Sequence, residues 1–308
     1  MQFLRCCIVT AMLTQCPGAL WAEDDAGDSA KPQTKYVLRY QFTPGQIIYW
    51  NVAHKAKIRT TAGGTTQTVE TASDSVKVWR IVNVNAKGEI TFVHSVASVH
   101  MRHKSSGREE TIMKFPLPKG KQPPPGYQSV ASSVGVPLTR FVMDAQGNIL
   151  RRVELRKKTQ QPTSGYEGPM TIPLPKDPVA VGAKWKNSHI VSAPRKDGTY
   201  KRVRLQQRFT LQSVRHDIAK IHVESVILTP IRDPNIKIHL VQSKTAGTVT
   251  FDLQRGLVLK QDLALDEEII GAPIGDASSM HFEMQFVEKY LANPPKSALR
   301  QKTGKRSR

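Results

Sequence analysis

The sequence predicts a mainly β protein built of two fused antiparallel β units, arranged as curved sheets or an open barrel, with one short helix inserted in the first unit. Three observations lead to this fold class. Apolar and polar residues alternate over most of the chain, which is the period of half-buried strands. A hairpin signature occurs twice, at residues 141–155 and 249–263. Helical spacing of apolar residues occurs once, between Tyr127 and Val134.

The repeated hairpin signature is the basis for expecting a duplication. In each copy, alternating apolar residues lead into an Asp-x-Gln turn that carries a glycine, and an apolar pair and a cation follow. This order encodes a strand, a tight turn and a return strand. Asp144 opens the first turn and Asp252 the second. We expect both carboxylates to accept hydrogen bonds from their own turns rather than to catalyse a reaction.

Residues 1–22 have the features of a secretory signal peptide. Arg5 precedes an apolar stretch at residues 6–13, and Ala22 stands before three acidic residues. Such a stretch is too short to span a bilayer. We expect export to the periplasm or the extracellular space with cleavage near Ala22, and lipidation at Cys16 is the alternative. No transmembrane segment is expected after this leader.

Cysteine content and charge narrow the function classes. All three cysteines lie in the leader, so a cleaved chain would have no disulfide, no cysteine-based zinc site and no cysteine nucleophile. Removing Arg5 from the 45 basic residues leaves 44 against 25 acidic residues, a net charge of about +19. A surplus of this size favours encounter with polyanions.

The first unit, residues 36–155, follows a polar linker at residues 23–35. Turn signals at Pro44-Gly45, Gly63-Gly64 and residues 85–88 separate its alternating segments. Residues 115–136 interrupt the pattern with a proline-rich loop, because proline supplies no donor to a strand ladder. The predicted helix ends this segment. Repeated features before it are 130 residues apart and those after it 108, and the difference, 22, equals the length of residues 115–136.

A second linker is predicted at residues 156–178, and the second unit occupies residues 179–292. Its expected strands include residues 200–214, residues 236–242 and residues 247–253, and the last alternating strand runs over residues 280–286. Residues 293–308 are rich in basic residues and contain no acid after Pro295, so we expect a disordered basic tail.

The candidate binding residues form a cationic stripe in the second unit. Val203, Leu205 and Phe209 define one face of their strand, which places three arginines on the other. Guanidinium groups repeated along a strand suit phosphate or carboxylate, because each can donate two parallel hydrogen bonds. The anion-binding candidates are Arg202, Arg204, Arg208 and Lys201.

Known catalytic and metal-binding patterns do not occur in this sequence. His100 and His103 are three residues apart on an expected strand and would face opposite ways, so we predict no metal site. No Gly-x-Ser-x-Gly elbow, phosphate-binding glycine loop or dinucleotide fingerprint is present. We therefore expect no cofactor and no catalytic residue.

The leader, the duplicated strand unit, the Gly182-Ala-Lys-Trp185 opening and the Pro-Pro-Pro-Gly-Tyr127 insertion resemble those of a family of uncharacterised exported bacterial proteins. The resemblance extends over most of the mature chain. It implies the β architecture, and it transfers no activity because its motifs have no assigned role.

Three functional hypotheses follow. The first is a non-catalytic exported protein that binds an anionic envelope polymer or a lipid headgroup through its basic face; nucleic acid ranks below these because aromatic residues make up only 6% of the chain. The second is a periplasmic carrier that holds an amphiphile in an open-barrel cavity. The third is a hydrolase whose site has no recognised motif. The sequence leaves the oligomeric state open.

Overall fold

The computed structural model describes residues 33–118, 120–156, 170–195, 197–271 and 277–295. The predicted leader, most of the two predicted linkers and most of the basic tail lie outside these residues. Strands account for 60% of the described residues and helices for 7%, which confirms the mainly β fold class. The first-half strands are β1 (Lys35–Tyr36), β2 (Ile47–Ala62), β3 (Thr65–Val84), β4 (Ile90–Ser105), β5 (Thr111–Phe115), β6 (Pro137–Met143) and β7 (Ile149–Glu154). The second-half strands are β8 (Val179–Ala180), β9 (Lys184–Pro194), β10 (Tyr200–Arg215), β11 (Ile218–Ile227), β12 (Ala246–Asp252), β13 (Leu257–Ile270) and β14 (Ser279–Leu291).

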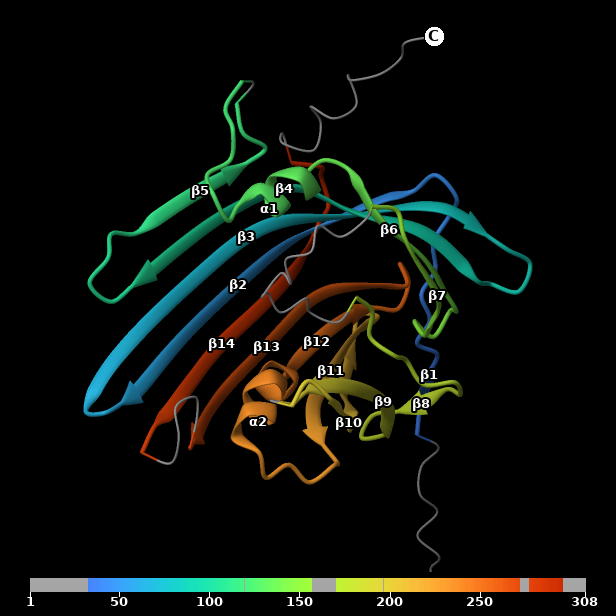
Figure 1. The fold of residues 1–308 in the computed structure, drawn as a ribbon. Helices are drawn as coiled ribbons and strands as arrows, with labels where there is room; N and C mark the ends of the chain where they lie inside the picture. The colour runs from blue at the N-terminus through green and yellow to red at the C-terminus, as the bar shows by residue number, and fades with distance from the viewer. Residues whose placement is uncertain (1–32, 119, 157–169, 196, 272–276, 296–308) are drawn as a thin grey trace, which may run out of the picture. The chain divides into compact units, whose positions relative to one another are not determined.

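Twelve of these strands form one antiparallel sheet. Its order is β7-β6-β4-β3-β2-β14-β13-β12-β11-β10-β9, and β5 pairs with β4 (Figure 1). The first predicted unit supplies the run from β7 to β2 and the second the run from β14 to β9, so the pairing of β2 with β14 joins the two. β7 and β9 are the two ends of this order and do not pair with each other, so the sheet is open. A separate pair, β1 and β8, brings together the segments that precede the two runs.

The two hairpin turns have similar hydrogen bonds. The Asp144 carboxylate accepts the N–H groups of Gln146 at 3.0 Å and Asn148 at 2.8 Å. The Asp252 carboxylate accepts those of Gln254 at 3.0 Å and Arg255 at 2.9 Å. Both carboxylates therefore hold their own turns together.

Both turns also contact one extended segment, residues 38–42. The N–H of Tyr40 donates to the Ala145 carbonyl at 2.8 Å in the first turn, and the N–H of Gln41 donates to the Gly256 carbonyl at 3.1 Å in the second. These matched contacts support an ancestral duplication, which stays a prediction.

The openings of the two runs match as well. The N–H of Gly45 donates to the Ile81 carbonyl at 2.9 Å, and the N–H of Gly182 donates to the Leu211 carbonyl at 2.7 Å. In each case a glycine lies just before a long strand, β2 or β9, and its N–H bonds to the next strand along the chain, β3 or β10. The motif Gly182-Ala-Lys-Trp185 therefore begins the second run as Gly45 begins the first.

One predicted helix is present and a second was missed. Helix α1 (Gln128–Ser133) lies where the spacing of apolar residues placed it. Helix α2 (Pro234–Leu240), followed by the 3₁₀ turn η1 (Val241–Ser243), occupies residues that the sequence analysis predicted to be a strand, and that prediction is wrong. The carboxylate of Asp233 caps α2 by accepting the N–H of Asn235 at 2.9 Å, and Pro234 occupies the first helical turn, where its missing N–H costs nothing.

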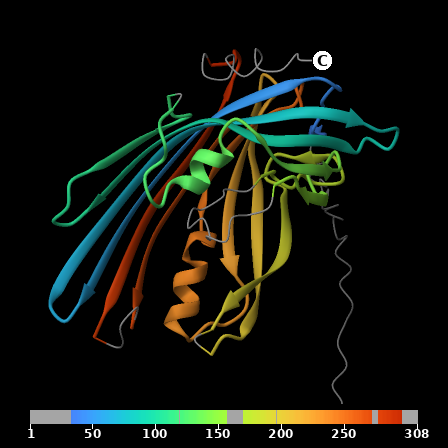
Figure 2. The same ribbon diagram turned by 45° about the horizontal axis from the view of Figure 1, so that its top comes forward.

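We call the face of the sheet that carries Trp50, Phe92 and Phe209 the inner face, and the opposite one the outer face. The main apolar cluster on the inner face includes these three residues together with Leu38 and Phe251. Ile236 and Leu240 of α2 pack against β9 and β10 on the same face, and Figure 2 shows α2 lying along the strands of the second half. The inner face is therefore covered by segments of the chain where the core forms.

The last part of the predicted second linker belongs to this core. Ile172 and Leu174 are 3% and 5% exposed. The N–H of Ile172 donates to the Tyr40 hydroxyl at 3.0 Å, and the indole N–H of Trp185 donates to the Pro173 carbonyl at 2.8 Å. Residues 170–174 are thus held against the extended segment at residues 38–42 and against strand β9.

A buried polar pair crosses the middle of the sheet. The ammonium group of Lys77 on β3 lies 2.7 Å from both carboxylate oxygens of Glu288 on β14, and the two residues are 8% and 2% exposed. The same ammonium group lies 4.7 Å from the ring centre of Trp50 and 5.0 Å from that of Trp79. The charges therefore compensate each other inside an aromatic environment.

His94 on β4 gives a testable pH dependence of stability. Burial, together with the nearby cations Lys77 and Arg152, lowers the pKa of His94 to about 3. Its Nδ1 atom is buried without a hydrogen-bond partner among the described residues. In the unfolded chain a histidine binds a proton below about pH 6.5, whereas in the folded chain His94 does so only below about pH 3. The free energy of unfolding should therefore fall as the pH falls through this window, by up to about 1.4 kcal/mol per pH unit.

Urea denaturation at a series of pH values measures this effect. The variant His94→Gln cannot take up the proton, so its stability should fall less steeply than that of the wild type between about pH 6.5 and pH 4. Parallel pH profiles for the two proteins would contradict the assignment.

Candidate functional site

The three arginines of the predicted stripe lie together on the outer face. Arg202, Arg204 and Arg208 are exposed, and they alternate with the buried Val203 and Leu205 along β10. Residues two apart on a strand are separated by about 6.8 Å. The guanidinium groups of the stripe therefore lie one repeat apart between Arg202 and Arg204 and two repeats apart between Arg204 and Arg208.

Neighbouring strands enlarge this stripe. Lys186 on the edge strand β9 pairs in register with Arg208, and Lys184 projects from the same side of β9. Lys220 on β11 also projects from this side, because it alternates with the buried Ala219 and Ile221. We call the resulting surface the basic face; its members are Lys184, Lys186, Arg202, Arg204, Arg208 and Lys220. Sequence reasoning missed the three lysines because only the strand register shows that they join the arginines.

The charges of the basic face are largely uncompensated. Glu224 lies 3.9 Å from Arg208, with both side chains about half exposed. Among the described residues, no carboxylate lies within ion-pair distance of Arg202 or Arg204. Six cations thus face one carboxylate on three adjacent strands. The basic face therefore carries an excess of positive charge within the described chain.

Lys201, the fourth predicted residue, is separated from the arginines. It alternates with them along β10, and its ammonium group donates to the Pro230 carbonyl at 3.0 Å. Its register partner is the buried Ala193. Lys201 therefore ties a loop to the inner side of the strand and does not extend the basic face.

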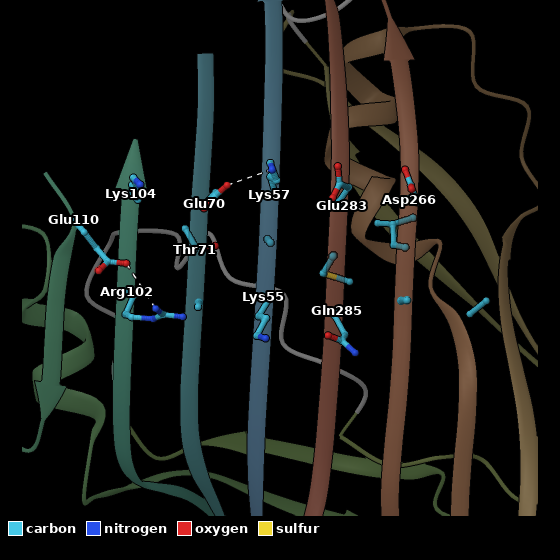
Figure 3. A pocket seen from close by; sticks show the side chains of 16 residues that line it. Lys55, Lys57, Glu70, Thr71, Arg102, Lys104, Glu110, Asp266, Glu283 and Gln285 are labelled. Atoms are coloured by element: carbon cyan, nitrogen blue, oxygen red, sulfur yellow. Dashed lines mark ion pairs between the residues drawn. The ribbon is translucent and has the colours of Figure 1, made fainter. Parts of the chain in front are cut away.

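A groove farther along the outer face has a different charge pattern. It has a volume of about 720 Å³ and lies over β4, β3, β2, β14 and β13, whose charged side chains project in a row (Figure 3). Lys57 pairs with Glu70 at 3.4 Å, and Arg102 pairs with Glu110 at 3.9 Å. The lining contains four cations and four carboxylates: Lys55, Lys57, Arg102, Lys104, Glu70, Glu110, Asp266 and Glu283. Because these charges balance, the groove lacks the excess positive charge of the basic face.

Metal-ligating groups do not converge in the described part of the chain. There, no cluster of three or more histidine, cysteine, aspartate or glutamate side chains could hold a metal ion. His100 on β4 pairs in register with Asp74, and His103 pairs with Thr71. Asp74 and Thr71 are three residues apart on β3, so their side chains point to opposite faces of the sheet. The side chains of His100 and His103, which pair with them, therefore do so as well.

Residues 163–258 match DUF6263, a family of unknown function. This agrees with the resemblance to an uncharacterised family, whereas export and duplication stay predictions. No curated protein matches the chain.

Two solved structures align with most of the chain at low similarity. A lipovitellin structure, described for its lipid–protein interactions, aligns over 83% of this chain at 10% identity with a TM-score of 0.40, and the aligned part is 26% of the lipovitellin chain. A DUF1329 family protein from Desulfovibrio piger aligns over 80% of this chain and 88% of its own, at 10% identity and a TM-score of 0.17. This chain thus corresponds to about a quarter of the lipovitellin chain, and the function must be argued from its own residues.

The two helices are short compared with a membrane-spanning helix. In the described segments, neither α1 nor α2 reaches the length and apolar character that crossing a bilayer requires.

Proposed function

We propose that this chain is a non-catalytic binding protein of the cell envelope that holds an anionic polymer on its basic face. The observation that carries the proposal is the excess of six cations over one carboxylate on β9, β10 and β11. The envelope location follows from the predicted leader. The basic tail predicted at residues 293–308 would add a non-specific electrostatic contribution.

The arrangement of the cations favours a polymer over a small anion. Arg202 and Arg204 are one strand repeat apart, and Arg208 is two further repeats along the same line. A linear chain with phosphate or carboxylate groups at intervals of about 7 Å can contact successive arginines without bending. Ser188 and Gln206, which lie between Arg204 and Arg208 on this face, are hydrogen-bonded to each other at 3.1 Å. Ile190, the register partner of Arg204, is 50% exposed. A single exposed apolar side chain is ordinary on a protein surface, and the cations around it suit a hydrated polymer better than insertion into a membrane.

The test compares two variants that lose the same charge. Arg202→Gln/Arg204→Gln/Arg208→Gln removes three cations from the basic face, and Lys55→Gln/Lys57→Gln/Lys104→Gln removes three from the balanced groove. Binding of inorganic polyphosphate and of poly(glycerol phosphate) is measured by titration calorimetry at several salt concentrations. The arginine variant should bind about 10- to 100-fold more weakly at low salt, and its slope of log K against log salt should decrease by about one for each lost contact.

The affinity of the lysine variant should stay close to that of the wild type. This variant loses the same net charge, but the lost lysines lie outside the basic face. Equal losses in the two variants would mean that net charge alone governs binding, and the basic face would not be the site. Absence of binding at low salt, or binding that does not weaken with salt, would reject the proposal. Binding to phosphatidylglycerol vesicles without binding to either polymer would reject the polymer in favour of a lipid surface.

A further inference from the structure

A second cavity lies on the inner face, away from the basic face. Its volume is about 630 Å³, within the range of pockets that hold small organic ligands. Four separate parts of the chain build its walls: residues 147–149 after the first hairpin turn, residues 170–173, the inner side of β9, β10 and β11, and Ser243 and Thr245. The hydroxyl of Thr171 donates to the Gly147 carbonyl at 2.7 Å, which ties two of these parts together.

Among the described residues, none that lines this cavity carries a formally charged side chain. None of its fourteen residues is a lysine, arginine, aspartate or glutamate, and His189 is the one titratable residue among them. Charged residues make up 23% of the chain, so about three would be expected in a lining of this size. A charged ligand would lose its hydration on entry without gaining a counter-charge. The cavity therefore selects against ions, in contrast to the balanced groove on the outer face.

The strand wall carries a row of uncharged polar side chains beside the apolar Val191 and Leu205. Asn187 pairs in register with Gln207, and Gln207 pairs with Ser225, so three uncharged polar side chains form a row across three adjacent strands. We call this the polar row. Ile149 and Met170 contribute apolar surface from the other parts of the chain, and Ile149 is 39% exposed. An apolar group that covered Ile149 would remove this surface from water.

We infer that the cavity binds an uncharged amphiphile, with its hydroxyl or amide groups on the polar row and its hydrocarbon part against Ile149 and Met170. Amide and hydroxyl side chains can both donate and accept hydrogen bonds, so they can match such a headgroup without a formal charge. The inference is independent of the proposed function, because no member of the basic face lines this cavity. It assigns the chain a second ligand of a different chemical class.

The experiment titrates the wild-type chain with three probes that share one hydrocarbon length: monooctanoylglycerol, octanoate and octylammonium. Titration calorimetry is run below the micelle concentration and at about 0.5 M salt, where attraction between exposed charges is screened. Monooctanoylglycerol should bind saturably at one site per chain. Octanoate and octylammonium should bind at least about 10-fold more weakly, because the cavity offers them no counter-charge.

Two variants locate the binding site. Gln207→Leu keeps the side-chain volume but removes an amide from the polar row, and it should weaken monooctanoylglycerol binding by about 2- to 10-fold. Ser225→Trp fills the cavity and should abolish binding. Ser188→Trp is the matched control, because Ser188 is exposed on the outer side of β9 and its variant should bind as the wild type does.

Several results would overturn the inference. These are absence of saturable binding by the wild type, binding of octanoate as tight as that of monooctanoylglycerol, and an equal loss of binding in Ser188→Trp and Ser225→Trp. If Ser225→Trp does not fold, unchanged binding by Gln207→Leu has the same force. The variant Arg202→Gln/Arg204→Gln/Arg208→Gln should keep full affinity for monooctanoylglycerol, so failure of this inference and failure of the proposed function are distinguishable.

Discussion

Replacing Lys77 by methionine should lower the free energy of unfolding by about 3–5 kcal/mol, as expected when one partner of a buried ion pair is removed. The Glu288 carboxylate is 2% exposed, and both of its oxygens lie 2.7 Å from the Lys77 ammonium group. In Lys77→Met this carboxylate would stay buried without a counter-charge. Urea denaturation at pH 7 gives the change in the free energy of unfolding.

The surroundings of the pair explain why the cost is large. Trp50 and Trp79 lie over the ammonium group, and the indole N–H of Trp50 donates to the Val258 carbonyl at 2.9 Å, which fixes that ring. The negative ring faces attract the cation and repel a carboxylate that has lost its counter-charge. Removing the lysine therefore changes a compensated site into an uncompensated one.

Two further variants separate this effect from the loss of a lysine in general. Lys57→Met breaks the exposed pair with Glu70, in which the side chains are 41% and 50% exposed, and it should cost no more than about 1 kcal/mol. Lys77→Met/Glu288→Leu removes both buried charges and should recover most of the loss, because an apolar replacement of a buried pair is often neutral. If Lys77→Met is no more destabilising than Lys57→Met, the buried pair does not contribute as argued.

The sequence predicted the strands well where burial alternates strictly. Ala219, Ile221 and Val223 are all buried on β11, between exposed or half-exposed polar residues. Residues 236–240 misled the same rule, because the alternation of Ile236, Ile238 and Leu240 fits a strand, whereas Ile236 and Leu240, four residues apart, share one face of a short helix. The deciding signal was Asp233-Pro234, which caps and starts α2. Local turn chemistry, rather than hydrophobic period, specifies a helix of this length.

The candidate sites were predictable only in part, because sequence shows neighbours along a strand but not across strands. The arginine stripe on β10 could be predicted, whereas its extension to Lys186 depends on the β9–β10 register. Lys77 and Glu288 are 211 residues apart in the sequence, and nothing local to either indicates the other. The inner cavity likewise needs residues 147–149 to meet β11, which depends on the arrangement of the whole sheet.

The two hairpin glycines allow a test of how the turns are held. Gly256 has a φ of +61°, and a Cβ atom there would lie 2.4 Å from the Gln41 nitrogen. Gly147 has a φ of +84°, and a Cβ atom there would lie 2.5 Å from the Tyr40 ring and 2.8 Å from the Ile172 carbonyl oxygen. Both glycines are thus needed for conformation and for close approach of the extended segment at residues 38–42.

Gly256→Ala should lower the free energy of unfolding by about 2–5 kcal/mol, the sum of left-handed backbone strain and displacement of a packed neighbour. Gly88→Ala is the matched control: its φ is +77° and no atom lies within 4 Å of the added Cβ, so it should cost only the backbone strain of about 1–2 kcal/mol. Gly147→Ala should resemble Gly256→Ala, because both glycines contact the same segment. Thermal and urea denaturation of the three variants measures the differences. If Gly256→Ala and Gly88→Ala are equally destabilising, the second turn is not held by residues 38–42. If only one hairpin glycine variant is more destabilising than Gly88→Ala, the two turns are not equivalent. The argument for duplication then loses its strongest structural support.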